Sequence, residues 1–175
     1  MIGVSASSNV TVENNTFTSC YMYGVQSNNA SSRTIVRNNR FSEMGKRVLN
    51  TSCVSCRGTD FIISGNALTD YGYCGISVGE WYKGSKKHLC TGVVEGNTLT
   101  CSDEYLANIA NVGLMDGGAI YLRTKMDGVS IRNNRIQGFS GMGSNRGIFC
   151  DDGAYNFEIV GNVITGIANS YCIDS

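Results

Sequence analysis

The chain has 175 residues, 14 of them basic and 14 acidic, so it carries no formal net charge at neutral pH. This length predicts a single domain, residues 1–175, with a real core. The balanced charge argues against a nucleic-acid-binding surface, and no apolar stretch approaches the roughly 18 residues that a membrane span needs. Glycine is abundant at 22 residues and proline is absent, which is typical of a chain with many tight turns and strands whose N–H groups are all used.

One short pattern recurs six times along the chain. Each copy has apolar residues in alternation, an Asn-Asn or Gly-Asn pair, one further residue, and then Phe, Leu or Ile. The last asparagine of the pair falls at Asn15, Asn39, Asn66, Asn97, Asn134 and Asn162, in steps of 24 to 37 residues. A repeat of roughly 20–50 residues is typical of a solenoid.

Each copy predicts a strand, a sharp turn and a second strand. The residues before the turn alternate as they do in a half-buried strand, and Asn-Asn and Gly-Asn readily adopt the positive φ of a sharp corner. One such unit cannot bury its apolar side alone, so successive units must stack with parallel strands about 4.8 Å apart. We therefore predict an all-β fold, a right-handed parallel β-helix solenoid whose handedness follows the general rule for parallel crossovers. The six asparagines would form a ladder, each side chain bonding at its own turn and to the next coil.

A third strand is expected between successive asparagine turns. Its copies are residues 23–26, 47–50, 74–78, 118–122, 146–150 and 170–173. The coils then cover roughly residues 1–32, 33–59, 60–89, 90–125, 126–154 and 155–175, about six in all. The extra length of the longer repeats falls between the asparagine turn and this strand, as in residues 101–117.

Both ends of the sequence look like interior coil segments, whereas solenoids carry atypical capping units. We therefore expect either a piece of a longer protein or end coils covered by a partner or an oligomer. The first residues lack the pattern of a secretory signal.

The eight cysteines are expected mainly as small buried apolar residues, with disulfides as the alternative in an exported protein. Cys53-x-x-Cys56 has no second matched pair and His88 is the only histidine, so no metal site is predicted.

Two segments in the middle of the chain could build a site. Glu80 and Trp81 follow a predicted strand, and an aromatic ring that packs on a pyranose beside a carboxylate that bonds hydroxyls would suit a sugar. The equal alternative is a loop whose tryptophan covers the side of the solenoid. Ser102 begins a segment typical of a short capped helix, which would shield the solenoid or form the wall of a groove.

A set of motifs then follows: Asp116-Gly-Gly-Ala-Ile-Tyr121, Ile131-Arg-Asn-Asn134 and Gly147-Ile-Phe-Cys-Asp-Asp-Gly153. With these motifs, residues 112–167 resemble the core of bacterial parallel β-helix (pectate-lyase-like) glycoside hydrolases of the xylosidase-like and fucosidase-like type. The resemblance implies glycan hydrolysis by two carboxylates, which would be Asp116 and either Asp151 or Asp152. Those families have longer chains, usually with a further domain.

The strand register supplies an independent pairing. If Ile76, Ile120 and Ile148 point inward, then Tyr121 and Phe149 point outward one above the other and form an aromatic step for substrate. Arg123 and Asp151 fall one coil apart, close enough for an ion pair.

Glu80, Thr124 and Asp152 come next in this register. Glu80 and Asp152 would be roughly 9–10 Å apart, near the separation of about 6.5–9.5 Å found in inverting glycosidases. Glu80 with Asp151 or Asp152 is therefore an acid–base candidate. Asp116 would lie at the other end of its strand, where the alternative role is to cap a turn.

Three functions follow from these observations. The first is a glycoside hydrolase acting on a poly- or oligosaccharide, with no cofactor and an extracellular or periplasmic location. The second is a lyase or epimerase for uronic-acid polymers, which would use calcium or basic residues such as Arg123, Lys125 and Arg146; the characteristic pectate-lyase arginine motif is absent. The third is a non-catalytic glycan-binding or structural β-helix. Neither nucleic acid nor membrane is an expected partner.

Overall fold

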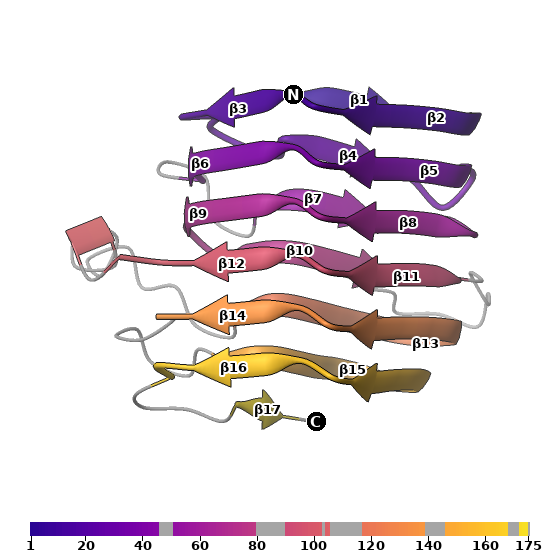
Figure 1. Ribbon diagram of the computed structural model, residues 1–175. Coiled ribbons are helices and arrows are strands. Elements are labelled where there is room, and N and C mark those ends of the chain that lie inside the picture. Colours follow the sequence, from indigo (N-terminus) through magenta and orange to yellow (C-terminus); the bar gives the residue numbers. More distant parts are fainter. Residues whose placement is uncertain are drawn as a thin grey trace.

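The computed structural model describes residues 1–45, 51–79, 90–102, 104–105, 117–138, 146–167 and 172–174. This part of the chain is all-β, and its parallel strands form two sheets, an arrangement compatible with a β-helix-like solenoid. The strands stack in chain order from the N-terminal end to the C-terminal end (Figure 1).

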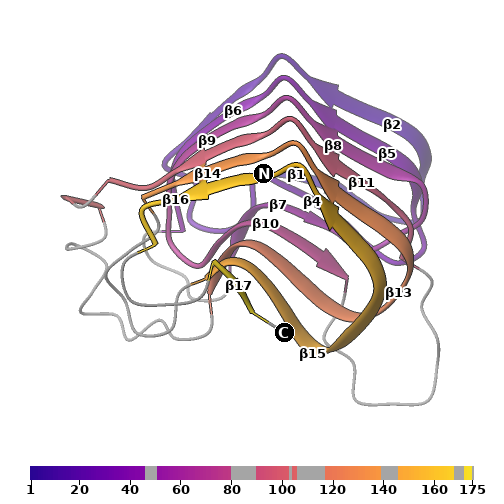
Figure 2. The same cartoon turned by 60° about the horizontal axis from the view of Figure 1, so that its bottom comes forward.

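The larger sheet has eleven strands and folds back on itself. Its order is β1-β4-β7-β10-β13-β11-β8-β5-β2, with β15 beside β13 and β17 beside β15. The sheet can fold back because the 15-residue strands β13 and β15 each run continuously around a corner, as Figure 2 shows. The strands are β1 (Ile2–Val4), β2 (Ser8–Glu13), β4 (Val25–Ser27), β5 (Ser32–Arg37), β7 (Ser52–Cys56), β8 (Phe61–Ser64), β10 (Cys74–Gly79), β11 (Gly92–Glu95), β13 (Gly118–Arg132), β15 (Arg146–Val160) and β17 (Ile173–Asp174).

The smaller sheet consists of the short strands that follow the asparagine turns, in the order β16-β14-β12-β9-β6-β3. Parallel pairing places one apolar residue of each strand in a single column, where the rings of Phe17 and Phe41 stack with centroids 4.8 Å apart. The strands are β3 (Thr16–Thr18), β6 (Arg40–Met44), β9 (Ala67–Tyr71), β12 (Thr98–Thr100), β14 (Arg135–Gln137) and β16 (Val163–Thr165).

The corner between the two sheets is built from the Asn-Asn and Gly-Asn pairs. The first residue of every pair has a φ between 54° and 65°, which confirms the predicted left-handed corner; these residues are Asn14, Asn38, Gly65, Gly96, Asn133 and Gly161. The second residue of each pair is hydrogen-bonded to its counterparts in the neighbouring repeats. Each Oδ1 from Asn39 to Asn162 accepts the backbone N–H and the Nδ2 of the preceding asparagine at 2.9–3.1 Å.

The core lies between the strand layers and consists of apolar columns. Ile76, Ile120 and Ile148 pair in register and are fully buried, which confirms the predicted inward alignment. All eight cysteines are free thiols, and six of them are buried. Cys172 is exposed and Cys20 is partly exposed, so the prediction of buried cysteines does not hold for these two.

One predicted strand cannot be compared directly with the structure. Residues 47–50 lie outside the described residues, and the strand that pairs with both β4 and β10 is β7. Cys53 and Cys56 of β7 are small apolar side chains that are completely buried.

The predicted helix start at Ser102 is described only in part. Ser102 Oγ accepts a hydrogen bond from the Tyr105 N–H at 3.2 Å, as an N-cap residue does. Glu104 and Tyr105 are helical. The remainder of the segment lies outside the described residues.

Candidate functional site

A second apolar cluster lies on the outer side of the large sheet, separate from the main core. We call it the outer cluster; its members are Tyr73, Cys74, Tyr121 and Phe149. The strand register brings the two central rings together. Tyr121 on β13 pairs with Phe149 on β15, and on its other side Tyr121 pairs with Ser77 on β10. This is the register that the sequence predicted.

The aromatic rings of the outer cluster pack closely against one another. Tyr121 and Phe149 stack with centroids 5.0 Å apart and planes 13° apart, while Tyr73 meets Tyr121 edge-on at 5.8 Å. Two arginines cover these rings: Arg123 lies 4.3 Å from the Tyr121 centroid, and Arg146 lies 3.9 Å from that of Phe149. Such cation–π contacts stabilise by about 0.5–2 kcal/mol.

This packing leaves little ring surface accessible. Tyr121 is 3% exposed and Phe149 is 7% exposed. A sugar that stacked on either ring would first have to displace the groups that cover it. The predicted aromatic step therefore lies on the outer side of the sheet as a packed cluster rather than as an open platform.

Asp151 is held at the edge of the outer cluster through both of its carboxylate oxygens. The Tyr121 hydroxyl donates a hydrogen bond to Oδ2. The backbone N–H of Asp152 donates to Oδ1 at 2.7 Å. The side chain is partly exposed, so it has a defined orientation and contact with solvent at the same time.

The predicted ion pair between Arg123 and Asp151 is wrong, although their backbones pair in register. No hydrogen bond or ion pair joins the two side chains in the described part of the chain. The guanidinium lies over the Tyr121 ring instead, and its Nη2 donates to the Tyr73 hydroxyl at 3.3 Å. The Arg123 Nε is buried without a hydrogen-bond partner.

Burial raises the pKa of Tyr121 above its ordinary value, and the hydrogen bond to Asp151 raises it further. Burial also raises the pKa of Tyr73. Tyr121 therefore keeps its proton at neutral pH and remains a donor to Asp151.

The predicted alignment beyond Asp151 is wrong. Regular pairing of β13 with β15 stops at Arg123 and Asp151, and the next pair is Lys125 with Tyr155, so Asp152 does not pair with Thr124. The physical reason is a bulge, because Asp152 and Gly153 have φ values of 54° and 68° and add length to β15. Asp152 is exposed at this bulge.

Three other predicted site residues cannot be placed beside Asp151. Glu80, Trp81 and Asp116 lie outside the described residues. The other five predicted site residues are described, and all of them lie on β13 or β15. They are Tyr121, Arg123, Phe149, Asp151 and Asp152.

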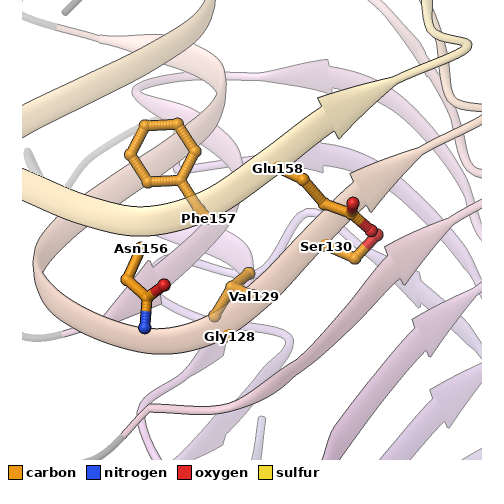
Figure 3. Close-up of a pocket in the computed structure, with 6 residues that line it drawn as sticks. All are labelled: Gly128, Val129, Ser130, Asn156, Phe157 and Glu158. Carbon is orange, nitrogen blue, oxygen red and sulfur yellow. The ribbon is translucent and has the colours of Figure 1, made fainter.

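The structure also contains a hollow that sequence reasoning missed. It has a volume of about 310 Å³ and is lined by residues 128–130 of β13 and 156–158 of β15 (Figure 3). In the sequence these residues look like ordinary strand positions, and the available signal was Gly128, a residue without a side chain. A second groove, of about 350 Å³, crosses β2, β5 and β8 at their outer side and includes Ile35 and Ile62.

The described residues contain no group of three His, Cys, Asp or Glu side chains placed to hold a metal ion. Nor does any helix within them have the length and apolarity to cross a membrane. Comparisons of the chain with protein-family models, with curated proteins and with solved structures found no match.

Proposed function

We propose that the chain is a pectate-lyase-like, right-handed parallel β-helix of about six coils that acts on carbohydrate. The parallel pairing of successive strands supports the solenoid, and the chain of hydrogen bonds from Asn15 to Asn162 supports an asparagine ladder. In this proposal the scaffold presents its site on the outer side of β13 and β15.

The proposed reaction is glycoside hydrolysis, and the observation that carries it is the position of Asp151. Asp151 is fixed through both oxygens, partly open to solvent and beside aromatic side chains, and these features support a role as one carboxylate of a hydrolytic pair. Asp151 would activate water or attack the anomeric carbon. A second carboxyl group, from Asp152, Glu80 or Asp116, would protonate the leaving oxygen.

The remaining predicted residues would hold the substrate. Arg123 pairs with Asp151 across β13 and β15, and its guanidinium would donate to a sugar oxygen. Tyr121 positions Asp151, and Phe149 supports Tyr121 by stacking. Trp81 is proposed as a sugar-stacking side chain from the sequence alone.

The test is hydrolysis of a panel of plant and host glycans, measured as release of reducing sugar. We expect Asp151→Asn to lower the rate by about a hundredfold or more, the usual contribution of an acid–base carboxylate. Asp70→Asn is the matched control, because Asp70 lies on β9 and uses Oδ1, which asparagine retains, to accept from Ser102. Equal activity of the two variants would refute the role of Asp151.

A second candidate is a non-catalytic glycan-binding or structural β-helix. The burial of Tyr121 and Phe149 favours it, because tightly packed rings stabilise a sheet face without any substrate. Glycan binding without any product would support this candidate. A calcium-dependent, unsaturated product would instead indicate a lyase.

A further inference from the structure

The hollow on β13 and β15 exists because one column of side chains is interrupted. Phe61, Gly92, Val129 and Phe157 pair in register across β8, β11, β13 and β15. The residues just before them, Asp60, Thr91, Gly128 and Asn156, therefore form a neighbouring column at the start of these segments.

The first two residues of this column, Asp60 and Thr91, are joined by hydrogen bonds. Thr91 Oγ1 accepts the Asp60 N–H at 2.8 Å and donates to the Asp60 carboxylate at 3.1 Å. At Gly128 the bridging stops, because no atom lies within 4 Å of the position that a Cβ would occupy. Gly128 also has a φ of 98°, which disfavours a replacement with a side chain. The space that a side chain would have filled remains open.

The next outward column changes from apolar to polar at the same level. On β8 and β11 this column holds Ile62 and Val93, whereas on β13 and β15 it holds Ser130 and Glu158. Ser130 Oγ is buried without a hydrogen-bond partner. Glu158 is exposed and makes no ion pair within the described residues. Figure 3 shows these two side chains on adjacent strands at one end of the hollow.

The other end of the hollow is formed by Asn156. Its Nδ2 donates to Asp127 Oδ1 at 3.0 Å, which leaves the Asn156 Oδ1 as a free acceptor in a fixed orientation. One end of the hollow therefore carries the Glu158 carboxylate and the Ser130 hydroxyl, which can donate or accept, and the other end carries the Asn156 amide oxygen as an acceptor.

We propose that this hollow binds one ring of a neutral sugar or a polyol of similar size. Sugar hydroxyls can donate to Glu158 and Asn156 and exchange a hydrogen bond with Ser130. A volume of about 310 Å³ is at the lower end for ligand pockets and suits a single ring. Glu158 and Asp127 disfavour an anion. A bound metal ion would need more oxygen ligands than the described residues provide here.

This site shares only its ligand class with the proposed hydrolase activity. It lies on the second halves of β13 and β15, beyond the bulge that follows Asp151. It would bind sugar whether or not the protein hydrolyses glycans.

The experiment is a titration of the ¹⁵N-labelled full chain with a panel of monosaccharides and short oligosaccharides, followed by amide chemical shifts. We expect shifts at Gly128, Ser130 and Asn156. Glu158→Gln should weaken the Kd by up to about tenfold, because a hydrogen bond to a charged acceptor becomes a weaker one to a neutral acceptor. Glu104→Gln, an exposed glutamate elsewhere on the chain, is the matched control and should leave the Kd unchanged.

Several outcomes would overturn the proposal. These are no shift at the three amides with any sugar, an equal Kd for Glu158→Gln and the wild type, or shifts caused by calcium ions and by no sugar. The outcome for the proposed function is separate. Binding at the hollow without hydrolysis of any glycan would leave this inference standing and remove the hydrolase, whereas hydrolysis lost in Asp151→Asn without shifts at the hollow would do the reverse.

Discussion

Replacing Asn66 with alanine tests whether the asparagine corner stabilises the stack. Asn66 is 1% exposed, and its side chain makes four hydrogen bonds. Oδ1 accepts the N–H and the Nδ2 of Asn39 at 2.9 and 3.1 Å, and Nδ2 donates to Val36 O and Asn97 Oδ1, each at 2.9 Å. At a net value of about 1 kcal/mol per bond, Asn66→Ala should lower the free energy of unfolding by about 4 kcal/mol. This is a large share of the 5–15 kcal/mol or so that is typical of a folded domain.

Asn15→Ala is the matched control at the exposed end of the same column. The Asn15 Nδ2 donates to Glu13 O at 2.8 Å and to Asn39 Oδ1 at 3.1 Å, but water can replace it there. We expect a loss of about 1 kcal/mol or less. Urea denaturation followed by circular dichroism measures both values, and hydrogen exchange at the Asn39 amide reports the local change in Asn66→Ala. A loss in Asn66→Ala no larger than in Asn15→Ala would refute the reasoning.

Three further predictions concern packing, pH and the outer cluster. Gly58→Ala places a Cβ 1.9 Å from Ser31 O and should destabilise by about 1–3 kcal/mol, whereas Gly3→Ala meets nothing within 4 Å; equal urea midpoints would contradict this. Burial raises the pKa of Cys56 from 9.0 to about 11 and those of Cys74 and Cys101 to about 12. Because these thiols lose protons in the unfolded chain before the folded one, stability should be fully present below pH 9 and fall between about pH 9 and 12; a flat profile of urea midpoints across that range would argue against it. Tyr121→Phe retains the stack on Phe149 but removes the donor to Asp151, so glycan hydrolysis should fall about tenfold while stability changes by about 1 kcal/mol; unchanged hydrolysis would show that this hydrogen bond does not position Asp151.

The candidate site was only partly predictable from the sequence. Register reasoning placed Tyr121 beside Phe149 and Arg123 beside Asp151, because strands in parallel pairs repeat their side-chain direction every two residues. It could not predict which donor Asp151 would use. The Tyr121 hydroxyl reaches the carboxylate, while Arg123 lies over the tyrosine ring, and this choice depends on the packing of several side chains at once.

The hollow at Gly128 could not be recognised from the sequence for a related reason. A glycine at a corner indicates only a permissive backbone. It becomes an opening because Thr91 and Asn156 lie on either side of it in the column. Both residues are far from Gly128 in the sequence, and only the pairing of the strands brings them beside it.

The sequence by itself determined the repeated elements: the left-handed corner before each asparagine, the inward isoleucine column and the parallel β character of the chain. These features follow from local properties, namely the conformations open to Asn and Gly and the two-residue period of a strand. Only the tertiary structure decided where the register shifts after Asp151, that β7 is the strand between β4 and β10, and that Tyr121 and Phe149 are buried. Those outcomes depend on contacts between repeats far apart in sequence, where a single bulge or an absent side chain changes which groups meet.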